Sequence, residues 1–548
     1  MTRRGDDRAA GPPSSRRRRE VALAAALIVL AAVAVYAGSL RGPFVFDDPA
    51  SIVDNPTIRD LRRLGTVLSP PGGMLAVEGR PVVNLTLAVN WALGREEVLG
   101  YHLFNVALHA LTALALFGLV RRTLLLPATA ARFGDSATGI AAVVASLWAV
   151  HPLQTETVNV VVHRGEGMMA LCYLGTFYAV VRSATSARPG RWHAAAAVAC
   201  GVGAGCKEII VTAPLTVLLY DRIFLAASWR EIARRRRWLY AGLLASWALL
   251  VLLVSGFYEP GGTGGMAQRL GPWSYLLLQP SNVLRYLGLS FWPHPLVLDY
   301  GMESPGPVVT VLPAVLAVTA LLGATAWALH RAPRVGFLGA AFFLVLAPTT
   351  TILPLASQTT AEKRMYLPLA AVLTLVVLGG AAAWRRLGSG RGAGWPGRAP
   401  LLAAALVIVA LGSQTVRRNH DYRSGVAIWS DTVAKRPDNA RAHYNLGREL
   451  ALRRDAAGAL AQFDRSLELD PGQPDTHRIR AFARFALGRY AGAREDAAAC
   501  RRLGGEMPAG FLDALQRAPG AASPADTGRS DVGPPGVTSS APASPRTR

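Results

Sequence analysis

About eleven long apolar runs constrain the fold of this chain most, because most of them approach the roughly 20 residues that an α-helix needs to cross a bilayer. Backbone N–H and C=O groups inside a bilayer must be paired within the chain, so each run is expected to be a helix. Of the 548 residues 51% are hydrophobic, which is too apolar for a soluble protein. The sequence therefore predicts an all-α polytopic membrane protein with spans near residues 20–40, 101–120, 137–153, 167–183, 192–206, 208–224, 238–256, 308–329, 335–354, 366–384 and 400–415.

One further apolar run, residues 273–292, is interrupted by Gln279, Pro280, Asn282 and Arg285. Irregular or polar segments are tolerated at membrane depth only where protein or a water-filled cavity surrounds them. We expect a re-entrant or interfacial helix here rather than another full crossing.

The basic residues lie in short clusters between the apolar runs. The formal net charge of +23 could suggest a nucleic-acid partner, but no single soluble face collects the arginines, so none is expected. Lys and Arg are typical of cytoplasmic loops, and here every second loop is basic. This predicts a cytoplasmic amino terminus and, with an odd number of spans, an outward carboxyl-terminal domain. The first run is too long for a signal peptide and lacks a small-residue cleavage site, so it is expected to remain as an anchor.

Beyond residue 415 the sequence becomes polar and helical with a regular period. Pro437 and Pro471 are 34 residues apart, which is the tetratricopeptide period. The unit between them carries the residues typical of that repeat, namely Leu446, Gly447, Ala459 and Phe463. Because so few repeats are marginal alone, they are expected to pack on the membrane domain or on a partner. The predicted domains are a disordered basic arm (1–19), a membrane domain (20–415), a repeat domain (416–505) and a disordered Pro-rich tail (519–548).

No group of His, Cys, Asp or Glu has a spacing typical of a metal site, and the four cysteines lie far apart or in apolar runs. We expect no disulfide framework, no zinc site and no metal or other cofactor.

Ionisable side chains in or beside membrane spans are costly, so each is a functional candidate. The loops on the outward side carry a recurring set that begins with an acidic pair directly after the first span. The set comprises Asp47, Asp48, Asp54, Asn55, His151, Glu156, His163, Arg164, Glu166, Lys207, Glu208, Arg285, Asp299, Glu362, Lys363, Arg364 and Tyr366.

A structural interpretation competes with a functional one at several of these positions. The acidic pair can cap a loop helix before Pro49, and Lys207 with Glu208 can form a self-neutralising ion pair at the interface. Arg364 can anchor the chain near the lipid headgroups, since long basic side chains commonly reach that level. His151 can be a hydrogen-bonded structural histidine.

Seven motifs follow one another in order and are trailed by the repeats. They read FVFDDPASIVDNPTI, RPVVNLTLAVNWALG, GYHLFNVALHAL, AVHPLQTETVNVVVHRGEGMMAL, CKEIIVTAPLTVLLYD, QPSNVLRYLGLSFWPHPLVLDY and AEKRMYLPLA. Over nearly all of residues 20–505 the chain resembles the GT-C superfamily of membrane-embedded sugar transferases. Within it, the chain is similar to the transmembrane and tetratricopeptide-repeat O-mannosyltransferases and their bacterial relatives. It differs from their pattern at Gln154, Glu166 and Lys363, where His, Asp and His are usual.

The resemblance implies a polyprenyl-phosphate sugar donor, an acceptor Ser or Thr hydroxyl on a translocated protein held partly by the repeats, and a base in the first outer loop. Neighbouring residues on an extended loop point in opposite directions, so we assign the base to Asp47, with Asp48 orienting it or binding the acceptor. Cations stabilise a departing phosphate, and the candidates are Lys207, Arg364, Arg164 and Lys363. Supporting roles are expected for Glu208, His151, Glu156, Glu166, Glu362 and Tyr366.

Two classes of function compete on this evidence. The first is an inverting glycosyltransferase for which mannose is the implied sugar, with glucose, aminoarabinose or another lipid-linked sugar left open. The second is a non-catalytic membrane scaffold whose repeats recruit envelope proteins, and a glycan ligase or polymerase would differ from the first only in its acceptor. High Ala, Arg and Gly content is typical of a GC-rich bacterial genome, which predicts an inner-membrane protein with an extracytoplasmic active face.

Overall fold

The computed structural model describes residues 15–70, 76–257, 271–303, 305–350, 358–387 and 398–520. Within these residues all regular secondary structure is helical, which confirms the predicted all-α class. The chain divides into two compact units, residues 1–449 and residues 450–548.

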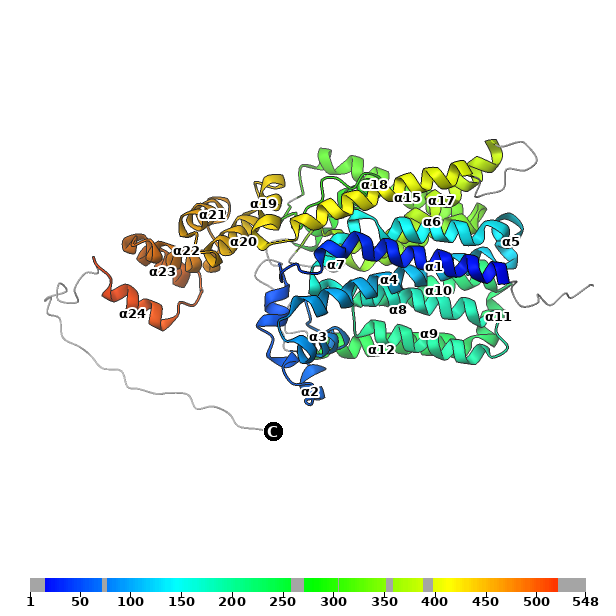
Figure 1. Ribbon diagram of the computed structural model, residues 1–548, viewed down its shortest axis with the longest axis horizontal. Helices are drawn as coiled ribbons and strands as arrows, with labels where there is room; N and C mark the ends of the chain where they lie inside the picture. Colours follow the sequence, from blue (N-terminus) through cyan, green and yellow to red (C-terminus); the bar gives the residue numbers. More distant parts are fainter. Residues whose placement is uncertain are drawn as a thin grey trace, which may run out of the picture. The chain divides into compact units, whose positions relative to one another are not determined.

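The first unit is a bundle of long helices joined by short ones (Figure 1). Its α-helices are α1 (Ser15–Tyr36), α2 (Leu64–Val67), α3 (Pro81–Gly94), α4 (Val98–Leu124), α5 (Pro127–Phe133), α6 (Ala137–Ala149), α7 (Thr155–Asn159), α8 (Arg164–Ser183), α9 (Pro189–Ala204), α10 (Ala213–Tyr220), α11 (Trp229–Arg235), α12 (Arg237–Phe257), α14 (Pro272–Phe291), α15 (Val308–Arg331), α16 (Pro333–Thr350), α17 (Pro368–Leu387), α18 (Arg398–Asp421), α19 (Gly425–Lys435) and the start of α20 (Ala440–Leu452). The short helical turns used below are η2 (Pro49–Val53), η6 (Val161–His163), η7 (Glu208–Thr212) and η9 (Glu362–Met365).

Within the bundle, α4 packs against α1, α6 and α8, α9 packs against α8 and α12, and α16 packs against α15 and α17. Small residues permit these close approaches, as is common between helices in membranes. A Cβ atom at Gly203 would collide with the side chain of Ile210, and one at Gly336 would collide with the backbone of Leu329 where α15 turns into α16. The bundle is thus held by close packing between helices as well as by apolar burial.

Six helical segments are long and apolar enough to cross a membrane: Ser15–Ser39, Val98–Leu124, Val308–Arg331, Pro333–Thr350, Pro368–Arg386 and Ala399–Asp421. The number among the described residues rises to eight if each of two bent pairs, Pro127–Ala149 with Pro152–Asn159 and Glu208–Leu225 with Trp229–Arg235, is one span. The polytopic class is therefore confirmed, but this count is below the eleven predicted spans.

The predicted spans that are not among these segments are helical, but they are short or carry charged residues. Helix α9 has only 16 residues, and α8 begins with Arg164 and Glu166 and ends near Arg182. The ambiguous run 273–292 forms one continuous helix, α14, with Pro280 inside it, and α14 is not among the six.

The two predicted disordered ends fall mostly outside the described residues. Helix α1 begins at Ser15, so Arg16–Arg19 form its first turns, while residues 1–14 lie outside the description. Of the predicted tail, residues 521–548 also lie outside it.

In the second unit, helices of 9 to 14 residues follow one another with short turns: α21 (Ala456–Leu469), α22 (Pro474–Ala486), α23 (Tyr490–Arg502) and α24 (Ala509–Arg517). Helices α22 and α23 form a hairpin whose turn contains Gly488 at φ 71°. Arg480 on α22 binds Asp464 on α21 and Asp496 on α23, at 2.8 and 2.6 Å. These ion pairs tie three successive helices together in the segment for which repeats are predicted.

Candidate active site

Three loops that are far apart in sequence meet at the end of the bundle near α7 (Figure 1). They are the segment 44–48 after α1, the segment 156–163 that includes η6, and the turn η9 before α17. Hydrogen bonds join the first loop to the second and the second to the third, through Asp48 and Glu156 respectively. Much of the predicted polar set therefore lies at one end of the helical bundle.

Phe46 shapes the turn immediately before the acidic pair. Its φ of 60° lies in the left-handed region, which a bulky residue rarely enters and which costs about 1–3 kcal/mol. The ring of Phe46 packs against those of His163 and Trp429, with centroids 5.9 and 5.7 Å apart. This packing offsets the strain and fixes the direction in which the next two side chains leave the backbone.

Asp48 is fully buried and holds two loops together. Its carboxylate accepts hydrogen bonds from the backbone N–H groups of Val45 (3.1 Å), Val161 (3.1 Å) and Val162 (2.8 Å). Burial raises the pKa of Asp48 to about 7, against the lowering effect of these three donors. Because both oxygens are occupied by backbone donors, Asp48 is placed to fix the loop geometry.

Asp47 differs from its neighbour because 31% of its side-chain surface is exposed. Its Oδ2 lies 3.4 Å from Nε2 of His163. Burial alone would raise the pKa of Asp47, but His163 together with the charges of Lys363 and Arg441 holds it below its usual value. Asp47 is therefore an ionised carboxylate that an outside molecule can reach.

Asp47 belongs to a group of four side chains, called here the Asp47 cluster: Asp47, Glu156, His163 and Lys363. The Nζ atom of Lys363 lies 2.8 Å from Nε2 of His163 and 3.5 Å from Oε1 of Glu156. The backbone N–H of Lys363 donates to Oε2 of Glu156 at 2.9 Å, and Oε1 of Glu156 lies 3.5 Å from Nδ1 of His163. The cluster thus joins an acid, an imidazole and an amine around one exposed carboxylate.

The imidazole of His163 can carry its proton on either nitrogen. A charged Lys363 can only donate, so at 2.8 Å it requires Nε2 of His163 to accept, and the proton then lies on Nδ1 facing Glu156. With the proton on Nε2 instead, His163 donates to Asp47 across 3.4 Å. Burial and the charge of Lys363 lower the pKa of His163, which favours the neutral ring in both cases. His163 can therefore pass a proton between its neighbours without becoming a lasting cation.

All four predicted phosphate-binding cations have partners inside the protein, but three of them are bound away from the Asp47 cluster. Lys207 forms a buried ion pair with Glu166, and burial lowers the pKa of Lys207. The guanidinium of Arg164 donates to Asn90 Oδ1 (2.6 Å) and to the carbonyls of Val161 and Tyr101 (both 3.2 Å). That of Arg364 donates to the carbonyls of Gln358 (2.6 Å) and Thr359 (2.9 Å). Lys363 is the predicted cation that lies in the Asp47 cluster.

Three further predicted residues contact parts of the bundle outside the Asp47 cluster. Glu208 lies 3.4 Å from Arg80, and His151 contacts the carbonyl of Ser290 and the N–H of Leu153, both at 3.2 Å. The hydroxyl of Tyr366 lies 2.9 Å from Nδ1 of His109.

Glu362 is fully buried in the turn η9. Its Oε1 accepts from the N–H of Val297 (2.5 Å) and the hydroxyl of Tyr300 (2.9 Å). Burial raises the pKa of Glu362 to about 7, and the negative charge of Glu156 adds to this effect. This carboxyl group anchors the loop after α14 to η9.

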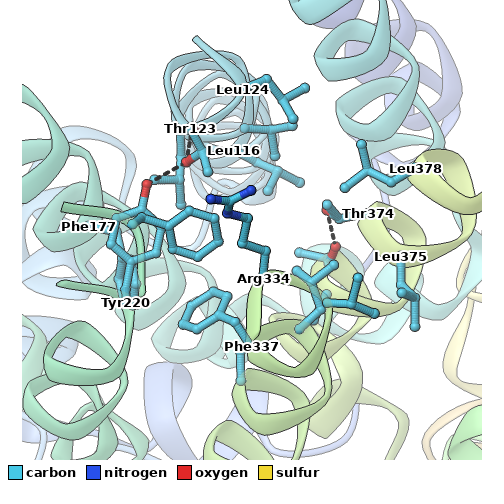
Figure 2. Close-up of a pocket in the computed structure, with 18 of the residues that line it drawn as sticks. Leu116, Thr123, Leu124, Phe177, Tyr220, Arg334, Phe337, Thr374, Leu375 and Leu378 are labelled. Atoms are coloured by element: carbon cyan, nitrogen blue, oxygen red, sulfur yellow. Dashed lines mark hydrogen bonds between the residues drawn. The ribbon is translucent and has the colours of Figure 1, made fainter. Parts of the chain in front are cut away.

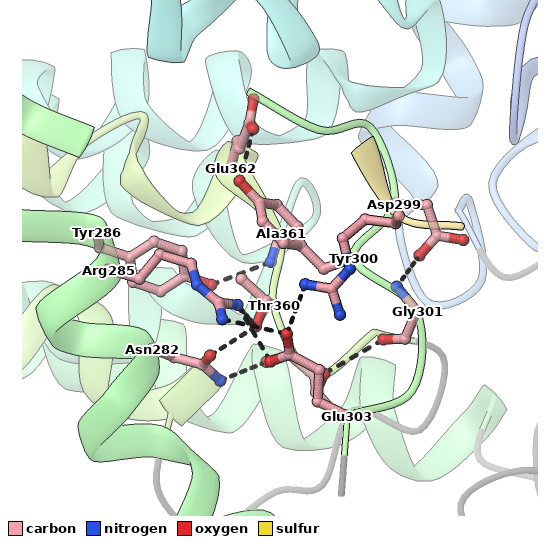
Figure 3. A network of polar contacts seen from close by, with 12 residues as sticks. Asn282, Arg285, Tyr286, Asp299, Tyr300, Gly301, Glu303, Thr360, Ala361 and Glu362 are labelled. Atoms are coloured by element: carbon pink, nitrogen blue, oxygen red, sulfur yellow. Dashed lines mark hydrogen bonds and ion pairs between the residues drawn. The ribbon is translucent and has the colours of Figure 1, made fainter. Parts of the chain in front are cut away.

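A second polar network adjoins the cluster and ties α14, the loop at residues 299–303 and η9 together (Figure 3). Arg285 binds Glu303 at 3.1 Å, and the N–H of Ala361 donates to the hydroxyl of Tyr286 at 3.0 Å. Arg441 forms a doubly hydrogen-bonded ion pair with the buried Asp299, at 2.5 and 2.6 Å. Since Arg441 also lowers the pKa of Asp47, the chain beyond α19 contributes charge to the cluster.

The structure adds three residues to those given roles from sequence. His163 was in the polar set but had no assigned role, whereas Trp429 and Arg441 lie in the segment predicted as repeats. Their positions depend on tertiary contacts with Phe46 and Asp47, and no local sequence signal marks them. Within the described part of the chain, no three His, Cys, Asp or Glu side chains are grouped so that they could hold a metal ion.

The fold and the cluster define a polytopic helical membrane protein with an acidic loop site at one end of its bundle. Comparison with known proteins finds no matching family model, but it finds distant relatives along most of the chain. The chain is 24% identical to protein O-mannosyl-transferase Tmtc1 of Drosophila melanogaster, with 81% of this chain and 61% of the relative covered. It is 25% identical to protein O-mannosyl-transferase TMTC4 of Homo sapiens, over 79% of this chain and 64% of the relative.

The similarity is higher over a shorter stretch, reaching 33% to protein O-mannosyl-transferase Tmtc2 of Drosophila melanogaster over 35% of this chain. The chain is thus a relative of proteins named O-mannosyl-transferases. It spans about 61% of the length of Tmtc1, so it corresponds to only part of that protein.

Proposed function

We propose that this protein is a membrane glycosyltransferase. It transfers mannose from a polyprenyl-phosphate donor to a Ser or Thr hydroxyl of a translocated protein. The observation that carries the proposal is Asp47, an ionised and partly exposed carboxylate beside an imidazole and an amine. The names of the relatives support the same class of reaction.

In the proposed reaction the acceptor oxygen attacks the anomeric carbon of the sugar, and the bond from that carbon to the phosphate oxygen breaks. Asp47 takes the proton of the acceptor hydroxyl as general base. The polyprenyl phosphate leaves with the bonding electrons, and the positive charge of Lys363 stabilises the charge that develops on it. Attack on the face opposite to the leaving phosphate inverts the anomeric centre.

The other residues of the site hold Asp47 and Lys363 in position. Asp48 fixes the loop that carries Asp47, and Glu156 holds the backbone and the side chain of Lys363. Lys207, Arg164 and Arg364 are bound to protein groups outside the Asp47 cluster, so in this proposal they maintain the loops. Lys363 is chosen because it lies in the cluster beside Asp47, although its contacts with His163 and Glu156 must also loosen when it meets a phosphate. No metal ion is assigned to the reaction.

The alternation of basic loops supports a cytoplasmic amino terminus, which would place the Asp47 cluster on the extracytoplasmic face. The helices after residue 416 would then hold part of the acceptor protein on the same side, in a bacterial inner membrane.

The proposal is tested by transfer of radiolabelled mannose from synthetic polyprenyl-phosphate mannose to envelope extract. Asp47→Asn is expected to abolish transfer while the protein still folds. Asp54→Asn is the matched control, because Asp54 is an exposed acid in the same loop, and it is expected to retain transfer. Full activity in Asp47→Asn would refute the assignment of the base, and no transfer by the wild-type protein from any lipid-linked sugar would favour a scaffold.

A further inference from the structure

A cavity of about 360 Å³ lies between α4, α8, α10, α16 and α17, and no member of the Asp47 cluster lines it. Its volume falls in the range of about 300–1,000 Å³ that ligand pockets occupy. The walls are almost entirely apolar, with aromatic rings at Phe177, Tyr220 and Phe337. Such a cavity suits a hydrocarbon chain.

Two arginines line the same cavity, Arg132 on α5 and Arg334 on the first turn of α16. Neither forms an ion pair with a carboxylate among the residues that the structure describes, and Arg385 adds a third positive charge close by, over the ring of Phe133 at 4.6 Å. Figure 2 shows the side chain of Arg334 directed into the space between Phe337, Phe177 and Leu116. An arginine that only anchored the chain would be expected to extend toward water.

The arginines and the Asp47 cluster belong to opposite ends of the helices. Arg132 and Arg334 lie near α5 and the start of α16, whereas the cluster lies near α7, at the other end of the bundle in Figure 1. In the proposed function the phosphate of the donor lipid meets Lys363, so its head would lie at the wrong end for Arg334. The occupant that fits has an apolar chain and an anionic head at the arginine end.

We propose that this cavity binds one acyl chain of an anionic phospholipid, of the phosphatidylglycerol type, with the lipid phosphate bound by Arg334 and Arg132. A chain that leaves the bilayer for the cavity exchanges one apolar surrounding for another, so chain burial gives little preference between lipids. The preference must come from the headgroup charge. Each basic side chain near an anionic lipid surface contributes roughly a fivefold effect on binding.

Native mass spectrometry of the full-length protein in detergent tests the proposal, with phosphatidylglycerol and phosphatidylcholine of identical chains added at equal concentration. The wild-type protein is expected to retain phosphatidylglycerol roughly 5- to 25-fold more than phosphatidylcholine. The double variant Arg132→Gln/Arg334→Gln is expected to retain the two lipids about equally. Arg386→Gln is the matched control, because Arg386 is an exposed arginine of α17 outside the cavity lining, and it is expected to keep the preference.

A second variant separates the chain from the headgroup. Ala341→Phe places a ring in the cavity and is expected to reduce retention of both lipids. Equal retention of the two lipids by the wild-type protein, or an equal loss in Arg386→Gln and the double variant, would overturn the proposal. A third outcome would also overturn the proposal: polyprenyl phosphate displaces phosphatidylglycerol when added at a lower concentration than that lipid, in the double variant as well as in the wild type. The occupant of the cavity would then be the donor lipid.

Discussion

Asp47 and Asp48 are adjacent and chemically identical, yet their replacement by asparagine is expected to have opposite consequences. Asp48→Asn is expected to destabilise the fold, because its carboxylate is the acceptor for three buried backbone N–H groups. Asp47→Asn is expected to leave the stability nearly unchanged, because Asp47 is partly exposed and its contact with His163 is long.

The magnitude follows from the number of acceptors that an amide can offer. In Asp48 the N–H groups of Val45 and Val161 share Oδ2, and that of Val162 binds Oδ1. An asparagine has one carbonyl oxygen, so its best orientation still leaves one buried N–H facing an NH₂ group. An unsatisfied buried donor costs about 1–3 kcal/mol. The loss of the partly exposed contact at Asp47 is expected to cost about 1 kcal/mol or less.

The assay is thermal unfolding of the purified variants in detergent, followed by tryptophan fluorescence at pH 8, where Asp48 with a pKa of about 7 is mostly ionised and both of its oxygens accept. Burial makes this ionised form costly, so the neutral amide gains back part of the stability that the lost acceptor removes. The expected order of unfolding temperature is wild type, then Asp47→Asn close to it, then Asp48→Asn clearly lower. If Asp48→Asn unfolds with the wild type, or if Asp47→Asn loses as much stability as Asp48→Asn, the division between a structural and an exposed aspartate is wrong.

Three further predictions concern the charges around the cluster. Lys363→Ala is expected to raise the pKa of Asp47, because the charge of Lys363 helps to hold that pKa below its usual value. The acid limb of the pH profile of kcat/KM should then move to higher pH, and an unmoved limb would argue against this charge effect. Glu362 has a folded pKa of about 7 against an ordinary 4.5, so its contribution to stability is complete below pH 4.5 and is lost as the pH rises through 7, a change of roughly 3 kcal/mol at most. Glu362→Gln keeps the Oε1 acceptor, so unfolding at pH 5 and pH 8 should differ less in this variant than in the wild type, and an equal difference would contradict the assignment. Arg441→Ala leaves the carboxylate of Asp299 buried without its cation and is expected to cost about 3–5 kcal/mol in denaturant unfolding, with Asp299→Asn added as the variant that should recover part of the loss.

The apolar runs predicted the helical class because length and hydropathy are local properties of a sequence. The separation of Asp47 from Asp48 was predicted from the alternation of an extended loop, but the structure produces it differently. Phe46 has a φ of 60°, and Asp48 has helical dihedral angles, φ −64° and ψ −47°, at the start of η2. The two side chains diverge because of this turn, which no residue preference predicts, since a phenylalanine rarely adopts a positive φ.

Ion pairs were the least predictable part of the site. Lys207 and Glu208 are adjacent and suggested a pair with each other, but Lys207 binds Glu166 and Glu208 binds Arg80. The partners are 41 and 128 residues away in the chain, so only the tertiary fold decides them. Similarly, Arg441 lies in the segment predicted as repeats and yet contributes charge to Asp47.

The pattern of partners itself indicates which charged residues are available for chemistry. A buried charge without a partner is destabilising by several kcal/mol, so the fold pairs Lys207 and surrounds Arg164 and Arg364 with acceptors. A group that is to meet a substrate must keep part of its surface and its hydrogen-bonding capacity unused. Asp47 meets this condition, because its carboxylate is partly exposed while that of Asp48 is fully buried and filled by backbone donors. The choice of Asp47 as base therefore rests on a comparison with the charged residues around it, whose hydrogen-bonding groups are already occupied by protein partners.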